Sequence, residues 1–292
     1  MFYDEVLGIA YLNMIVFGIL GNSFLLYQFS VKFITNHRTR SINLIIIHLA
    51  FANVTMILFR SIPTIMSVWG PTSSLDGTGK KIIMYLLGVV RSLFFCSTCL
   101  LCVFQAITIN SNIPMWMKLK TRDPKYIITC CFLLWIYNLL IDVIVPVYVV
   151  GLMNSTDTEK RWSTGYIHID FYNANTVKII IWKSVCYIAF LCLMVFSSGY
   201  MVFILYSHNQ QIQYIHSTKI SPRASPEIRA TKAILLLVIT FVCFNSVSSP
   251  LIVFMASSKV IRVQVVHITV LLSLCYPVVS PFMLISIDHQ IS

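Results

Sequence analysis

The amino-acid sequence predicts an all-α membrane protein: a bundle of seven transmembrane helices with the amino terminus outside and the carboxyl terminus in the cytosol. Hydrophobic residues make up 58% of the 292 residues and charged residues only 11%, whereas soluble domains carry roughly 25% charged residues. Seven apolar stretches reach the roughly 18 residues that a membrane-crossing helix needs. The basic residues are concentrated in alternate connections between these stretches.

The seven stretches occupy most of the chain, and we expect one domain that covers residues 1–292. We place the membrane spans at about residues 6–29, 42–66, 82–109, 126–150, 177–205, 232–256 and 265–286. The sixth span is preceded by a helix start, because Ser225 is a good capping residue, Pro226 suits the first helical position and Glu227 lies favourably at the positive end of the helix dipole.

Prolines interrupt four of the spans, and each proline frees a backbone carbonyl that can let its helix kink. They are Pro63, Pro146, Pro250, Pro277 and Pro281. A purely structural kink and a functional hinge are both open interpretations for Pro250.

The distribution of lysine and arginine predicts the orientation. The connections that follow the first, third and fifth spans, with Lys232 at the last border, contain eleven of these residues, and the opposite segments contain six. The positive-inside rule then places the amino terminus outside. The net charge of +11 is explained by contact with an anionic inner leaflet of the lipid bilayer, so no nucleic-acid partner is expected. Asn154 begins a glycosylation sequon in the long outer loop.

No pattern in the chain indicates catalysis. We find no nucleophile elbow, no His-Glu-x-x-His motif, no phosphate-binding glycine loop and no paired carboxylates. All nine cysteines fall within apolar spans, where packing is the expected role. We therefore expect neither an enzyme nor a cofactor or metal site.

Charged residues inside the spans are the strongest functional signal, since each costs roughly 2.5 to 3.5 kcal/mol on insertion scales. Arg60, Arg91, Asp142 and Lys183 lie about 9, 14, 12 and 9 Å below the outer ends of their spans, at roughly 1.5 Å of rise per residue. This common depth predicts a polar ligand chamber that opens to the outside. An internal salt bridge, for which Arg91 with Asp142 is the most plausible pair, is the alternative. One acid cannot neutralise three bases, so a remaining cation favours an anionic or hydrogen-bond-accepting ligand.

Uncharged polar residues form a second set in the inner half of the spans: Asn22, Asn53 and Ser280. Two interpretations are open, a set of interhelical hydrogen bonds that only packs the helices and a network that rearranges on activation. Asn53 also begins a sequon, but its place inside a span makes glycosylation unreachable.

Several short motifs resemble vomeronasal type 1 receptors, a pheromone-receptor family of G-protein-coupled receptors, in order over nearly the whole chain. They are HLAFAN at 48–53, CSTCLLCVFQAIT at 96–108, KLK at 118–120 with PKY at 124–126, SGYMV at 198–202, SPEIRAT at 225–231, and CYP at 275–277 with SPF at 280–282. The Asp-Arg-Tyr and Asn-Pro-x-x-Tyr hallmarks of rhodopsin-like receptors are missing. Bitter taste receptors are the nearest rival family, and their motifs fit less well.

The resemblance implies a multi-pass plasma-membrane receptor that binds a small-molecule chemosignal from outside and activates an inhibitory-class heterotrimeric G protein. The inner ends of the third, fifth and sixth helices would then contact the G protein. The candidate contact residues are Lys118, Lys120, Arg122, Arg229 and Lys232, and contact with lipid headgroups is the alternative for them.

One departure from the family pattern concerns an outer disulfide that the resemblance implies. Gly79 and Trp162 stand where family members usually carry its two cysteines. Because both cysteines are missing together, no unpaired thiol is left. A disulfide of this kind typically stabilises the folded protein by roughly 2 to 4 kcal/mol, and that stabilisation is absent here. A functionally degenerate member of the family is therefore one alternative to a working receptor. A small membrane transporter or channel is a separate alternative.

Overall fold

The computed structural model describes residues 2–35, 40–69, 77–109, 125–143, 174–215, 226–257 and 263–291, and all of them except Val143 are α-helical. The seven helices of this described part are α1 (Phe2–Thr35), α2 (Arg40–Trp69), α3 (Gly77–Ile109), α5 (Lys125–Asp142), α8 (Ala174–Ile215), α9 (Pro226–Ser257) and α10 (Val263–Ile291). The predicted all-α bundle of seven helices is confirmed.

Six of these helices are long and apolar enough to cross a membrane: α1, α2, α3, α5, α8 and α10. The apolar stretch of α9 is shorter within the described residues and runs from Leu235 to Leu251. The helix itself begins at Pro226, the position that the sequence assigned to the first helical residue.

The fourth helix is shorter than its predicted span. We expected the span to reach residue 150, but α5 ends at Asp142, and residues 144–150 lie outside the described residues. A helix that continued would pair the carbonyl of Asp142 with the backbone N–H of residue 146, and Pro146 has none. Pro250, Pro277 and Pro281, by contrast, lie inside continuous helices.

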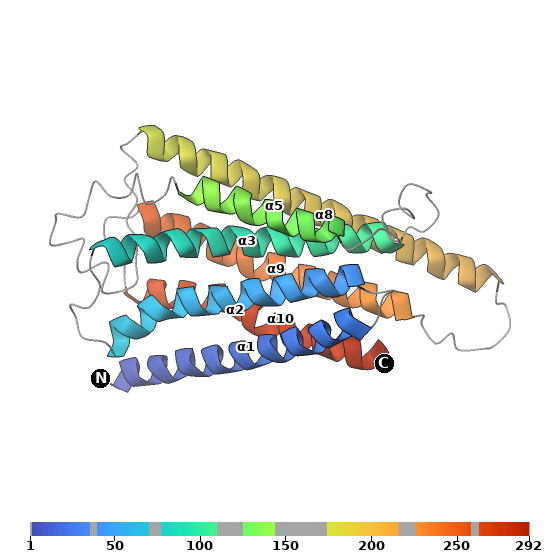
Figure 1. The fold of residues 1–292 in the computed structure, drawn as a ribbon, viewed down its shortest axis with the longest axis horizontal. Coiled ribbons are helices and arrows are strands. Elements are labelled where there is room, and N and C mark those ends of the chain that lie inside the picture. Colours follow the sequence, from blue (N-terminus) through green and yellow to red (C-terminus); the bar gives the residue numbers. More distant parts are fainter. Residues whose placement is uncertain are drawn as a thin grey trace.

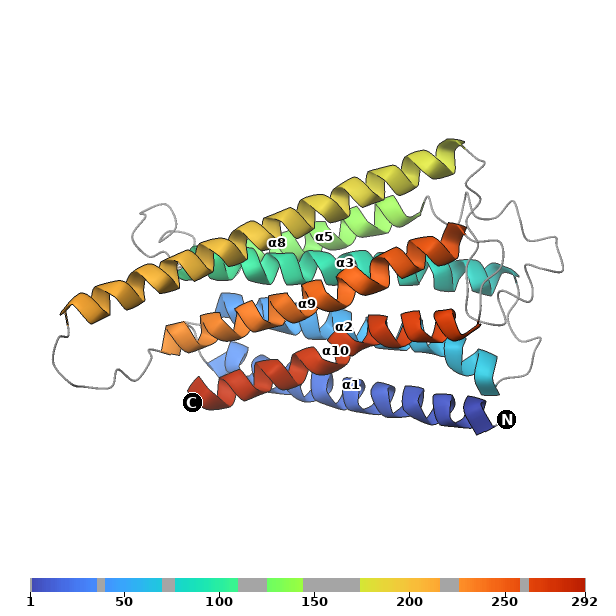
Figure 2. The ribbon, with the colours of Figure 1, turned by 180° about the vertical axis from the view of Figure 1, so that it is seen from behind.

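The helices run along one common direction, and the two termini lie at opposite ends of the bundle (Figures 1 and 2). Helix α3 is central, because it packs against α2, α5, α8 and α9, whereas α1 packs against α2 and α10 at one side. The most apolar window of α3 is 67% buried and the corresponding windows of α5 and α8 are each 17% buried. Helices α5 and α8 therefore form the periphery of the bundle.

A cluster of aromatic rings joins the central helix to its neighbours. Phe94 on α3 lies 5.2 Å from Phe241 on α9 and 5.1 Å from Tyr276 on α10, measured between ring centroids. Phe95 on α3 lies 5.0 Å from Tyr187 on α8. Large apolar side chains on the outside of the helices are exposed, as the lipid-facing surface of a membrane bundle requires.

The three uncharged polar residues predicted as a set do meet. The side-chain amide of Asn53 on α2 donates to the side-chain oxygen of Asn22 on α1 at 3.0 Å and to the hydroxyl of Ser280 on α10 at 2.9 Å. Asn22 in turn donates to the backbone carbonyls of Gly18 and Pro277. All three polar side chains are buried, so this network ties α1, α2 and α10 together.

A second polar contact ties α2, α3 and α5. The indole N–H of Trp135 donates to Nε2 of His48 at 3.0 Å, and Nδ1 of His48 lies 3.0 Å from the hydroxyl of Ser97. Ser97 already donates its hydrogen to the carbonyl of Leu93. The histidine must therefore carry its proton on Nδ1 and donate it to Ser97, because Nε2 has to accept from the indole.

Candidate ligand-binding site

The four charged residues of the predicted chamber lie in one half of the bundle, the half that contains the amino terminus (Figures 1 and 2). Each is nearer to the helix end at that side than to the other end of its helix. Arg60, Arg91 and Lys183 lie inside their helices, as the predicted common depth requires, whereas Asp142 is the last residue of α5 and not about 12 Å below its end. Their side chains make three contacts, each between a different pair of helices.

The first contact joins α5 to α8. Lys183 donates to the carboxylate of Asp142 and forms a salt bridge with it. The side chain of Asp142 is fully buried and that of Lys183 is 19% exposed. The sequence-based pairing of Arg91 with Asp142 is therefore wrong, since the acid binds the lysine of α8 instead.

The second contact joins α3 to α9. The guanidinium Nη2 of Arg91 donates to the hydroxyl of Ser249 at 3.1 Å. Ser249 directly precedes Pro250, the proline inside α9. The positive charge of Arg91 thus meets a neutral hydroxyl and not the carboxylate of Asp142.

The third contact joins α2 to α10 and includes α1. Arg60 donates through Nε to the hydroxyl of Ser273 at 3.4 Å, and it lies close enough to Arg91 and Tyr11 for electrostatic interaction with both. The buried hydroxyl of Tyr11 lies 3.1 Å from Nδ1 of His267 and also donates to the carbonyl of His267 at 3.2 Å. Sequence reasoning missed Tyr11 and His267, although a histidine inside the seventh span was an available signal.

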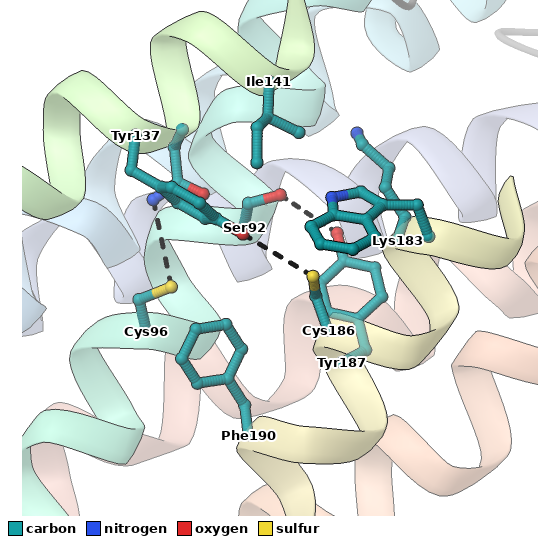
Figure 3. Close-up of a pocket in the computed structure, with 10 residues that line it drawn as sticks. Ser92, Cys96, Tyr137, Ile141, Lys183, Cys186, Tyr187 and Phe190 are labelled. Carbon is teal, nitrogen blue, oxygen red and sulfur yellow. Dashed lines mark hydrogen bonds between the residues drawn. The ribbon is translucent and has the colours of Figure 1, made fainter. Parts of the chain in front are cut away.

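A pocket lies beside the salt bridge, between α3, α5 and α8 (Figure 3). The pocket is open: the empty space of about 300 Å³ between its lining residues includes open solvent, and its enclosed part has room for about one water molecule. The lining combines aromatic rings, thiols and polar groups: Ser92, Cys96, Tyr137, Asn138, Ile141, Trp182, Lys183, Cys186, Tyr187 and Phe190. The sequence analysis found only Lys183 among these residues, because the others look like ordinary packing residues of apolar helices.

The remaining candidate residues belong mainly to segments that the structure does not describe. Lys118, Lys120, Arg122 and the sequon at Asn154 lie outside the described residues, as does Trp162. Arg229 and Lys232 lie in the first turns of α9, at the end of the bundle opposite the amino terminus. Within the described ranges, no group of three or more His, Cys, Asp or Glu side chains could hold a metal ion.

Comparison with known proteins places this geometry in a family. Residues 6–292 match the model of the vomeronasal organ pheromone receptor family. The vomeronasal type-1 receptor 1 of Gorilla gorilla gorilla is 37% identical over 289 residues, which is 98% of this chain and 81% of that receptor. The vomeronasal type-1 receptor 4 of Homo sapiens is 36% identical, over 96% of this chain and 93% of that receptor.

More distant proteins share the architecture. An olfactory receptor class A-like protein 1 of Danio rerio is 29% identical over 97% of this chain and 90% of its own. The crystal structure of squid rhodopsin superposes with a TM-score of 0.72 over 96% of this chain and 77% of that chain, at 14% identity. That identity is too low to indicate more than the same seven-helix fold.

The apolar helices, the rhodopsin-like fold and these relatives agree with one another. They describe a multi-pass protein of the plasma membrane and a receptor rather than an enzyme. The chain belongs to the vomeronasal type 1 family of G-protein-coupled pheromone receptors.

Proposed function

We propose that this receptor binds a small extracellular chemosignal in the half of the bundle that contains the amino terminus, and that it then activates an inhibitory-class heterotrimeric G protein. The amino terminus faces outside in this proposal, in agreement with the excess of basic residues in the opposite connections. Arg60 and Arg91 form the cationic part of the chamber, and the pair of Asp142 with Lys183 forms its wall on the side of α5 and α8.

The contact of Arg91 with Ser249 is the observation that carries the proposal. The carboxylate of Asp142 is occupied by Lys183, so the Arg91 guanidinium keeps its full charge beside a neutral partner. An anionic ligand group offers this guanidinium a stronger, charge-assisted hydrogen bond than the serine does. The ligand would thereby draw Arg91 away from α9 beside Pro250 and favour one of two arrangements of the bundle.

Ligand binding is tested in cells with a panel of sulfated steroids, the matching unsulfated steroids and volatile odorants, read through a promiscuous G protein. We expect Arg91→Ala to raise the half-maximal concentration of acidic agonists about 10- to 100-fold, which corresponds to the loss of one charged hydrogen bond. For neutral agonists, the half-maximal concentration should rise much less. Lys178→Ala is the matched control, because Lys178 is an exposed cation near the same end of α8. If Arg91→Ala responds as the wild type does to acidic agonists and also to neutral agonists, the proposed chamber is contradicted.

G-protein coupling is tested separately. Basic residues at the end of the bundle opposite the amino terminus support a cytosolic contact surface, and Arg229 and Lys232 at the start of α9 are its described members. In this proposal Lys118, Lys120 and Arg122 complete that surface. We expect the receptor to lower forskolin-stimulated cyclic AMP, and pertussis toxin to abolish this effect. A response that survives the toxin rejects the inhibitory class and leaves ligand binding untouched.

The double variant Arg229→Ala/Lys232→Ala should reduce the cyclic AMP response while surface expression stays normal. Lys125→Ala is its control, because it removes a basic residue at the same end of the bundle, from the start of the peripheral helix α5. An equal loss of response in both variants points to contact with lipid headgroups rather than to a G-protein surface.

A further inference from the structure

The contact of Arg91 with Ser249 leaves hydrogen-bond donors for which the described residues supply no acceptor. A guanidinium group has five N–H donors, and Arg91 uses Nη2 for the hydroxyl of Ser249. That hydroxyl accepts this bond, so its own hydrogen remains available to a further acceptor within the described structure. Ser249 and the nearby Tyr187 are both neutral. Several donors and one positive charge therefore meet at one place inside the bundle.

A second arginine adds its charge to this place. Arg60 on α2 lies near enough to Arg91 on α3 for electrostatic repulsion, and the two helices pack directly against each other. Like charges repel more strongly inside a protein than in water, and an anion between them offsets this repulsion. The carboxylate of Asp142 is not that anion, because Lys183 binds it. The two arginines therefore create an electrostatic environment that favours a bound anion.

Aromatic rings close the bundle on the side of the arginines that faces away from the amino terminus. Phe94 lies three residues after Arg91 on α3. Tyr276 lies three residues after Ser273, the hydroxyl partner of Arg60, on α10. Residues three apart are neighbours on a helix surface, and the centroids of these two nearly fully buried rings are 5.1 Å apart. The rings therefore form a floor beneath the two arginines.

The donors at this place are accessible to a small ion. Both Arg60 and Arg91 are only partly buried, although they lie inside membrane-spanning helices. Chloride accepts hydrogen bonds, carries the required negative charge and is the most abundant small anion outside cells. We propose that a chloride ion binds between Arg91, Ser249 and Arg60 in the resting receptor. This inference rests on the proposed ligand chamber, because an acidic chemosignal uses the same guanidinium group.

The bound ion has a consequence for the response to ligands. It accepts hydrogen bonds from Arg91 on α3 and from the hydroxyl of Ser249 on α9, so it stabilises the contact of these helices beside Pro250. An acidic chemosignal has to displace the ion before it reaches Arg91, whereas a neutral chemosignal does not. Chloride is therefore a competitor of acidic ligands alone.

Chloride binding is measured on the full receptor in nanodiscs of zwitterionic lipid, without any chemosignal. The line width of the chloride NMR signal reports exchange of the ion with the receptor, and bromide should compete with chloride whereas the much larger gluconate should not. We expect Arg91→Ala to raise the chloride dissociation constant about 10- to 100-fold, the effect of one charged hydrogen bond. Lys178→Ala is the matched control, because it removes an exposed cation from the same half of the bundle.

Two milder variants keep the test valid if Arg91→Ala does not fold, which surface expression and elution volume would reveal. Ser249→Ala should raise the chloride dissociation constant about three- to tenfold, the effect of one hydrogen bond. Ser246→Ala is its control, because that hydroxyl is exposed and donates to the carbonyl of Cys243 in the same helix. Arg91→Lys keeps the charge but not the planar set of donors, so its affinity for chloride should lie between those of wild type and Arg91→Ala.

Competition is tested in cells whose external chloride is replaced by gluconate. The half-maximal concentration of acidic agonists should fall about fivefold, as mass action gives for an ion present at about four times its dissociation constant. Neutral agonists should respond equally in both solutions. A chloride line width that is the same for wild type and for folded Arg91→Ala or Ser249→Ala overturns the chloride site. If Arg91→Ala then still weakens acidic agonists, the ligand chamber stands without a resident ion.

Discussion

The carboxylate of Asp142 on α5 lies directly against Gly88 on α3, where a methyl group on the glycine would come within 2.9 Å of Oδ1 and 3.4 Å of Cγ. Because real Cβ atoms essentially never approach another heavy atom below 3.0 Å, no other residue type fits at position 88 without displacing the acid. The missing side chain leaves the space in which the buried carboxylate meets Lys183.

Gly88→Ala should therefore destabilise the receptor by about 1 to 3 kcal/mol, as overpacked cores do, and weaken the salt bridge. A thermal melt of the purified receptor measures this as a lower melting temperature. Gly199→Ala on α8 is the matched control, because nothing lies within 4 Å of the added methyl group and alanine favours helices over glycine. A Gly88→Ala receptor that melts at or above the wild-type temperature contradicts the close approach.

The pair of Asp142 and Lys183 makes a second prediction, because a buried charge without its partner is costly. Asp142→Asn and Lys183→Met should each lower surface expression and the melting temperature. The free energy of unfolding should fall by about 3 kcal/mol when the remaining charge stays buried. The double variant should be more stable than either single variant. The measurement is a double-mutant cycle on the melting curves, and strict additivity of the two losses would show that the residues do not interact.

The positions of the charged residues along the helices could be predicted from the sequence, but their partners could not. Hydropathy and the rise of a helix place Arg60, Arg91, Asp142 and Lys183 in the same half of the bundle, and the structure agrees, although α5 ends at Asp142 itself. Which side chains meet depends on how each helix is rotated and on small residues such as Gly88. Charge alone suggested Arg91 for Asp142, yet Arg91 is directed at Ser249.

The uncharged polar residues likewise include features that the sequence predicted and features that it did not. Asn22, Asn53 and Ser280 were predicted as a set because an amide inside an apolar span needs partners, and the network is confirmed. The pocket between α3, α5 and α8 was missed, because tyrosine, cysteine and phenylalanine are normal packing residues. Only the three-dimensional arrangement shows that they surround free space.

The contact of Trp135 with His48 makes a third prediction. Trp135→Phe removes the indole N–H and leaves Nε2 of the partly buried histidine without its donor, so we expect the free energy of unfolding to fall by about 1 kcal/mol. Trp182→Phe is the matched control, because Trp182 is exposed at the lipid-facing side of α8. Melting curves of both variants in the same detergent provide the comparison. Equal melting temperatures would mean that the histidine finds another donor.

The last prediction concerns the hydrogen-bond network of Asn53 with Asn22 and Ser280. It distinguishes a network that only packs the helices from one that rearranges on activation. Asn53→Ala removes the hydrogen bonds to Asn22 and Ser280, and at roughly 0.6 kcal/mol for each interhelical bond the expected loss is about 1 kcal/mol. All three residues belong to α1, α2 and α10, which are separate from the contact of α3 with α9 at Arg91. We therefore expect a lower melting temperature with basal cyclic AMP signalling unchanged.

The control for this variant is Thr55→Val, which removes a hydroxyl whose bond in the described structure stays within α2, to the carbonyl of Phe51. Basal signalling is measured in cells without agonist and normalised to the receptor at the surface, so that reduced expression does not imitate reduced activity. A change in basal signalling with Asn53→Ala, absent with Thr55→Val, would favour a network that rearranges on activation. In that case the hydrogen bonds of Asn53 describe the resting arrangement, and α10 has to move relative to α2 when the receptor is activated.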